Sequence, residues 1–140
     1  MTGMSSTSSA LEPRTGLGDL NAQVRETHTG IVFLVGERAY KAKKSLRTDF
    51  LDFSTPELRE RACANEVALN RRLAPESYLG VAHFSGLEGE QAEPVIVMRR
   101  YPDEARLTML VKNNEPVHRH LCVIAEMIAR FHATAYRCCT

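Results

Sequence analysis

The amino-acid sequence predicts an α+β fold, with an antiparallel β-sheet packed against one helix and a second long helix near the C-terminal end. A length of 140 residues suits a single hydrophobic core. Short β-branched runs are separated by turn residues, and two longer segments repeat apolar residues at helical spacing. The resulting order of strand, strand, helix, strand, strand, helix is typical of an α+β domain.

The first elements follow a segment, residues 1–19, that is rich in Ser, Thr and Gly and is predicted to be a flexible N-terminal arm. The domain proper is expected over residues 20–140. Residues 31–35 are β-branched and aromatic, and Gly36 begins a turn. Residues 38–44 then alternate in character, so this stretch predicts a β-hairpin. Its second strand places three side chains on one face: Ala39, Lys41 and Lys43.

A helix is predicted next, because Ser54 and Glu57 can form a capping box and Pro56 suits the first helical turn. Pro75 is expected to end it. Apolar residues recur at helical spacing and predict the face that packs on the sheet: Leu58, Ala62, Leu69 and Leu73.

The remaining elements are two strands, a short helix and a long helix. The strands are predicted at residues 79–84 and 94–100, joined by a solvated loop at 85–93. A short helix is expected at 106–111, and a long one from 116 to about 136. The apolar stripe of this last helix is expected to be partly exposed in the isolated chain: Leu121, Ile124, Ile128, Phe131 and Ala135.

Net charge, apolar runs and cysteine spacing argue against several classes of protein. A formal net charge of +1 argues against a general attraction to nucleic acid or to an anionic membrane. The longest apolar runs are too short to span a bilayer. No apolar stretch follows Met1, so a cytoplasmic location with reduced thiols is expected. The spacing of the four cysteines does not match a zinc site, and no metal ligands are predicted.

Glu66 is the most informative side chain. On a helical wheel it lies about 80° from Leu58, beside the predicted apolar stripe. A carboxylate that faces a core destabilises the fold by several kcal/mol unless it is paired. Lys41 and Lys43 are the candidate partners. The alternative is a glutamate at the edge of the stripe, with both lysines solvated.

Four segments in this order resemble a known lobe: 26–34, the run Ala39-Tyr40-Lys41, 65–73 and 95–100. Together they are similar to the N-terminal lobe of the aminoglycoside phosphotransferase-like kinases, over about residues 24–136. The subgroup that the chain resembles most couples this kinase-like domain to a C-terminal P-loop ATPase domain in actinobacterial proteins. The resemblance implies ATP as cofactor, with Mg, and a kinase-like N-lobe followed by the first helix of a C-lobe.

Site residues follow from the resemblance. Ala39-Tyr40-Lys41 is similar to the Val-Ala-Ile-Lys strand of kinases, which implies that Lys41, or alternatively Lys43, contacts the α- and β-phosphates. Glu66 would be the helix partner of that lysine. The phosphates would be covered by a turn that lacks the GxGxxG pattern. This turn consists of Thr27, His28, Thr29 and Gly30. The implied hinge, whose backbone would bind an adenine resting against Val32, contains Met98, Arg99 and Arg100.

Catalytic residues are not expected in this chain. In kinases of this type, the catalytic Asp loop and the magnesium ligands follow the last helix present here, and the final aspartate of the chain is Asp103. The chain is therefore expected to be an ATP-binding lobe, a fragment of a small-molecule phosphotransferase that meets its acceptor only in the full-length protein. Two alternatives remain open: a non-enzymatic α+β interaction module, which could self-associate through the final helix, and a lobe that completes a site with another chain.

Overall fold

The structure is a computed structural model that describes residues 22–85 and 92–136. Within these residues, five strands form one antiparallel sheet in the spatial order β1-β2-β3-β5-β4. Their bounds are β1 (Gln23–Glu26), β2 (Gly30–Val35), β3 (Arg38–Lys43), β4 (Tyr78–Phe84) and β5 (Glu93–Arg99). The helices are α1 (Pro56–Arg71), α2 (Leu107–Lys112), α3 (His118–Thr134) and the 3-10 turn η1 (Asp103–Ala105). The predicted α+β class is confirmed. The arm predicted at 1–19, and the adjacent Cys138 and Cys139, lie outside the described residues.

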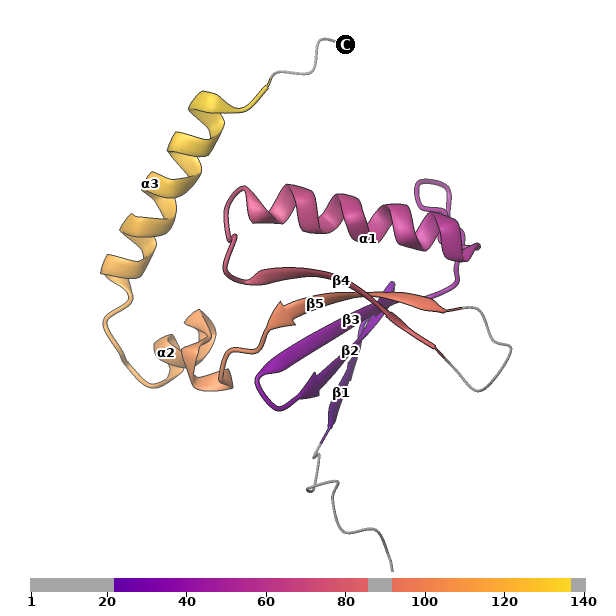
Figure 1. Ribbon diagram of the computed structural model, residues 1–140. Helices are drawn as coiled ribbons and strands as arrows, with labels where there is room; N and C mark the ends of the chain where they lie inside the picture. Colours follow the sequence, from indigo (N-terminus) through magenta and orange to yellow (C-terminus); the bar gives the residue numbers. More distant parts are fainter. Residues whose placement is uncertain (1–21, 86–91, 137–140) are drawn as a thin grey trace, which may run out of the picture.

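The hairpin of β2 and β3 forms as predicted, around a turn in which Gly36 has a φ of 53°. Lys41 lies opposite Val32 on β2 and opposite Ile96 on β5. Figure 1 shows α1 lying across one face of the sheet. The alternation of β3 directs Ala39, Lys41 and Lys43 to that face.

β1 is missing from the sequence prediction. It pairs only with β2, at the edge of the sheet, and its single aliphatic side chain, Val24, is exposed. A strand with one neighbour and no buried face shows no apolar alternation. The sequence pattern therefore contained no signal for it.

The cap of α1 differs by one residue from the prediction. The Thr55 hydroxyl accepts a hydrogen bond from the Leu58 amide at 3.3 Å, so Thr55 is the N-cap and the assignment of Ser54 was wrong. The Ser54 hydroxyl instead hydrogen-bonds to the Asp52 carboxylate at 2.5 Å. The helix ends at Arg71, before Pro75, as the proline predicted.

The buried face of α1 was also predicted wrongly. Cys63 and Val67 are buried and pack with Ile96 of β5. Leu69 and Leu73, which were expected to face the sheet, are 58% and 36% exposed. The helix is turned so that the face bearing Cys63 and Val67 meets the sheet, and two leucines near its C-terminal end remain open.

A charged contact explains this rotation. The Arg59 side chain is buried, and its guanidinium donates to both carboxylate oxygens of Glu93, at 2.5 and 2.7 Å. It also donates to the Phe53 carbonyl at 2.8 Å. Because a buried cation must be fully paired, Arg59 has to face β5. Apolar periodicity does not include an arginine, and this is why it indicated the wrong face.

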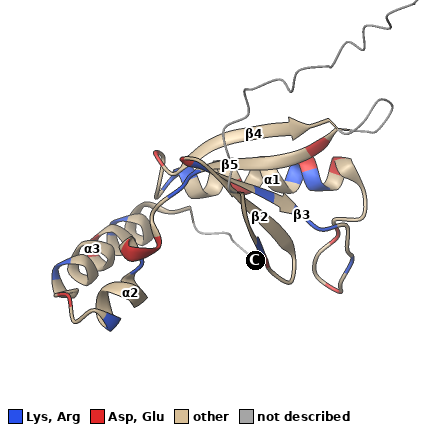
Figure 2. Ribbon diagram, turned by 90° about the horizontal axis from the view of Figure 1, so that it is seen from below, with Lys and Arg blue, Asp and Glu red and all other residues tan. Residues whose placement is uncertain are grey.

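The segment after β5 leaves the sheet. Figures 1 and 2 show α2 and α3 beyond one end of the sheet, with α3 standing away from it. A cation–π contact joins α3 to the end of α1: the guanidinium of Arg72, the C-cap of α1, lies 4.5 Å from the centre of the Phe131 ring. The large side chains of the predicted stripe, Leu121, Ile124 and Ile128, are exposed, as expected. Among the described residues, no helix has the length and apolar character needed to cross a membrane.

Two alanine substitutions test the observed orientation of α1. Val67→Ala removes two buried methyl groups and should lower the free energy of unfolding by about 1–2 kcal/mol. Leu69→Ala trims a largely exposed side chain and should change it by less than about 0.5 kcal/mol. Urea denaturation followed by circular dichroism measures both variants. A larger loss for Leu69→Ala would mean that the apolar stripe faces the sheet after all.

Candidate functional site

Glu66 lies between two lysines. The Lys41 Nζ donates to Glu66 Oε1 at 2.7 Å, and the Lys43 Nζ donates to Glu66 Oε2 at 2.8 Å. The side chains of Lys41, Lys43 and Glu66 are 30%, 9% and 19% exposed, so the cluster is largely shielded from water. The structure thus brings together the three residues that the sequence singled out, and both lysines pair with the carboxylate. The alternative, in which the lysines are solvated, is wrong.

Local geometry produces this cluster. Lys41 and Lys43 are two residues apart on β3 and therefore point to the same side. Glu66 lies on α1, on the face toward β3, one turn after Cys63. Lys43 is further enclosed by the Phe53 ring, whose centre lies 5.0 Å from its Nζ. Within residues 22–85 and 92–136, no aromatic ring covers Lys41 in this way, and Lys41 is the more exposed lysine, so it is better placed to reach a ligand.

Charge in the cluster is unbalanced, because two ammonium groups share one carboxylate. Burial raises the pKa of Glu66, but the hydrogen bonds and charges of Lys41 and Lys43 outweigh burial, so its pKa lies below the ordinary value of 4.5. The carboxylate is therefore ionised at neutral pH. The cluster keeps one net positive charge, which suits the binding of an anionic group.

A cavity of about 490 Å³ lies under the same face of the sheet. Its apolar wall contains Val32, Leu34 and Ala39, and its lining also includes the predicted residues Thr27, Arg99 and Arg100. Lys41, although not part of this lining, lies directly opposite Val32 across β2 and β3. The ion cluster is therefore next to an apolar cavity, the usual composition of a small-molecule site.

The predicted hinge is only partly open to a ligand. Met98 belongs to β5 and packs against the core cluster. The Arg99 amide donates to the Ser77 carbonyl at 2.9 Å, and the Arg100 amide donates to the Glu37 carbonyl at 2.9 Å. Both amides are thus already bonded, so neither is the free donor that an adenine ring needs.

Sequence reasoning missed the next residue, Tyr101. It lines the cavity, and within the described residues no hydrogen bond uses its amide. The Tyr101 N–H is therefore an available donor at this edge. Its position became evident only when the structure showed where β5 ends and which amides it uses.

The turn between β1 and β2 closes on itself. The Thr27 hydroxyl donates to the Gly30 carbonyl at 3.0 Å and accepts from the Gly30 amide at 3.1 Å. The amides of His28 and Thr29 make no hydrogen bond within the described part of the chain and could receive an anion. Gly30 is required here, because a Cβ at this position would lie 2.8 Å from the Ala42 carbonyl oxygen.

A salt bridge forms part of the cavity lining. Both Asp103 carboxylate oxygens accept from Arg25 Nη2, at 2.6 and 2.8 Å, and Arg106 lies 3.2 Å from the same carboxylate. This bridge joins β1 to the segment after β5, and all three residues line the cavity. Because its partners are 78 residues apart, no local pattern could have revealed it.

Comparison with known proteins gives three matches, all uncharacterized proteins of mycobacteria. Two are Rv2004c of Mycobacterium tuberculosis (strain ATCC 25618 / H37Rv) and Mb2027c of Mycobacterium bovis. Each is 58% identical over 114 residues, which is 81% of this chain and 23% of the relative. The chain thus spans about a quarter of the length of these relatives. No model of a protein family matches the chain, and no solved structure does.

The pH dependence of Glu66→Gln tests the ion cluster. At pH 7 this variant leaves two shielded ammonium groups without a carboxylate and should lower the free energy of unfolding by about 2 kcal/mol or more. Because the folded pKa of Glu66 lies below 4.5, its stabilisation is present above pH 4.5 and is lost as the pH falls through the folded pKa. The gap between wild type and variant should therefore narrow below pH 4.5.

Denaturant titrations at several pH values measure this gap. Glu126→Gln is the matched control, because its carboxylate forms only an exposed pair with Arg130 at 3.6 Å. It should stay within about 0.5 kcal/mol of wild type throughout. A gap for Glu66→Gln that does not change from pH 7 to pH 3 would contradict the account.

Proposed function

We propose that this chain is the nucleotide-binding lobe of a kinase-like small-molecule phosphotransferase, similar to the aminoglycoside phosphotransferases. The observation that carries the proposal is the Lys41–Glu66–Lys43 cluster beside an apolar cavity. A strand lysine held by a helix glutamate is the arrangement that kinases use to bind nucleotide phosphates. The chain would be catalytically incomplete by itself.

In this proposal, the ligand of the cavity is ATP. Its adenine lies between the apolar side chains of β2 and β3, and accepts a hydrogen bond from the Tyr101 amide. Its phosphates approach Lys41, the more exposed of the two lysines, which Glu66 holds in place. The free amides of His28 and Thr29 are the nearest candidates on the turn for further phosphate contacts.

Phosphoryl transfer would take place only in a longer protein. ATP supplies the γ-phosphoryl group, and a hydroxyl of a small molecule would receive it. The aspartate that orients this hydroxyl and the ligands of Mg would come from residues outside this chain, in which no aspartate follows Asp103. Most of the length of the mycobacterial relatives lies outside the matched segment, which supports this reading. We also propose that the full protein carries a P-loop ATPase domain and is cytoplasmic.

Thermal stabilisation by Mg-ATP tests the nucleotide proposal. Millimolar Mg-ATP should raise the Tm of the wild-type chain, because a ligand that binds only the folded state stabilises it. Lys41→Ala should abolish most of the shift while Lys43 still pairs with Glu66. Lys112→Ala, at the end of α2, is the control and should keep the full shift.

Two results would overturn parts of this proposal. No shift for the wild-type chain would reject nucleotide binding by the chain. A full shift for Lys41→Ala would mean that Lys43 is the phosphate ligand, and Lys43→Ala should then lose it.

The exposed stripe of α3 favours a second candidate, a non-enzymatic interaction module. Leu121, Ile124 and Ile128 leave one side of the helix open, and exposed apolar patches of this kind favour association. The partner present in any solution of this chain is a second copy. In this candidate, α3 would pair with α3 of that copy.

Sedimentation velocity tests the candidate module. Wild type should associate as its concentration rises to about 100 µM, and Ile124→Glu should remain monomeric because it places a charge in the stripe. Arg119→Gln makes the same change in charge outside the stripe and should associate like wild type. A wild-type chain that is monomeric throughout would remove this candidate.

A further inference from the structure

A second cavity lies at the end of the sheet where β3 begins and β5 ends. Its volume is about 560 Å³, within the range of small-molecule sites, and its lining is Glu37, Arg38, Glu76, Leu79, Arg99 and Arg100. We propose that this cavity binds a phosphate monoester that carries hydroxyl groups, with Arg38 and Arg99 holding the phosphate. The proposal is independent of nucleotide binding.

Two arginines line this cavity from neighbouring strands. Arg38 and Arg99 are direct partners in the antiparallel pairing of β3 with β5. Like charges placed opposite each other on neighbouring strands destabilise a sheet. Within the described residues, neither side chain forms an ion pair or hydrogen bond. An anion between the two guanidinium groups would remove this repulsion.

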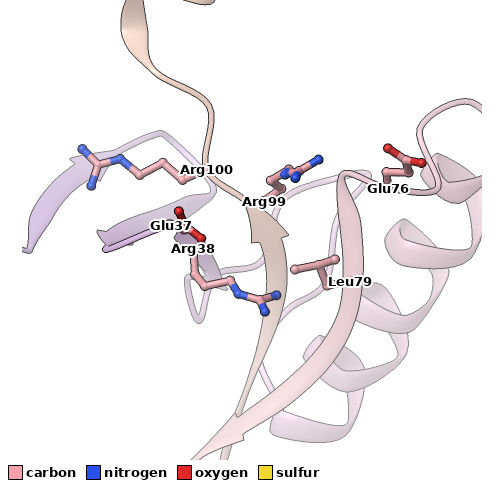
Figure 3. A pocket seen from close by; sticks show the side chains of 6 residues that line it. All are labelled: Glu37, Arg38, Glu76, Leu79, Arg99 and Arg100. Carbon is pink, nitrogen blue, oxygen red and sulfur yellow. The ribbon is translucent and has the colours of Figure 1, made fainter.

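The third arginine is already occupied. Arg100 donates to the Gly36 carbonyl and to the Gln23 side chain, both at 3.3 Å. Figure 3 shows its side chain directed away from those of Arg38 and Arg99. Arg38 and Arg99 are therefore the two cations left to bind a ligand.

The chemistry of the two free arginines favours phosphate. A guanidinium offers a planar fork of N–H donors that fits phosphate oxygens in pairs. Two guanidinium groups match the charge of a phosphate monoester, about −1.5 to −2 at pH 7. Arg38 and Arg99 leave different strands, so they can approach one phosphate from two directions.

The two glutamates of the cavity indicate the rest of the ligand. Figure 3 shows Glu37 beside Arg38, and the Arg99 side chain directed toward Glu76. Carboxylates repel a phosphate but accept hydrogen bonds from hydroxyl groups. A ligand with hydroxyls next to its phosphate would satisfy both kinds of side chain, as a phosphorylated polyol or sugar does.

This site differs from the nucleotide cavity. Arg99 and Arg100 line both cavities, but Arg38 lines the second one and not the first. Lys41 and its partners lie under the face covered by α1. Strand alternation directs Arg38 to the opposite side of β3 from Ala39 and Lys41. Substitutions of Arg38 and Lys41 can therefore separate the two sites.

Isothermal titration calorimetry with glycerol 3-phosphate tests the proposal on the 140-residue chain. Wild type should bind it with a Kd of about 1 mM or lower, and Arg38→Gln should weaken binding at least tenfold, a loss of about 1.4 kcal/mol. Lys41→Ala and Arg119→Gln should bind like wild type. The Tm of Arg38→Gln should equal or exceed that of wild type, because one of two like charges is removed.

Several outcomes would overturn the proposal. Absence of binding up to about 20 mM glycerol 3-phosphate would reject the site, since a Kd above this corresponds to a binding free energy less favourable than about −2.3 kcal/mol. If Arg38→Gln and Arg119→Gln lost the same amount of affinity for glycerol 3-phosphate, binding would reflect general charge attraction and not a specific site. If Lys41→Ala lost binding of glycerol 3-phosphate while Arg38→Gln bound it fully, the phosphate would belong to the nucleotide cavity. Inorganic phosphate that binds as tightly as glycerol 3-phosphate would reject the role of the glutamates.

Discussion

The half-buried carboxylate of Glu66 is the constraint on which this structure depends. It fixes α1 to β3 through two hydrogen-bonded ammonium groups, 2.7 and 2.8 Å away. Removing either kind of charge would leave the other poorly solvated, so the contact specifies one position of the helix. It also presents Lys41 at the edge of an apolar cavity. The same contact thus holds the fold together and builds the candidate site.

A second charged contact acts nearer the start of α1. Arg59 joins the helix to Glu93 of β5 and to the Phe53 carbonyl, while Glu66 joins it to β3. Together the two contacts set both the rotation and the position of α1 on the sheet. The small apolar core between them, which includes Cys63, then packs against β5. Burial also raises the pKa of the Cys63 thiol, which keeps it protonated and unreactive.

The sequence indicated those parts of the structure that local spacing determines. Alternation along β3 placed Lys41 and Lys43 on one face, and the helical wheel placed Glu66 beside the predicted apolar stripe. Both lysines were therefore candidate partners for Glu66, with solvated lysines as the alternative. Features that depend on a partner far away in the sequence were not predictable. The buried face of α1 follows from Arg59 and its partner 34 residues away. That the Tyr101 amide has no partner among the described residues depends on which carbonyls the preceding amides reach. Edge strand β1 has no buried face to create a pattern.

A crystal structure of the chain with a non-hydrolysable ATP analogue tests the central claim most directly. The adenine should lie against Val32 and accept a hydrogen bond from the Tyr101 amide. A phosphate oxygen should lie within about 3.2 Å of the Lys41 Nζ, with Glu66 still bonded to that lysine. An analogue bound elsewhere, or bound in the cavity with its phosphates remote from both Lys41 and Lys43, would contradict the account.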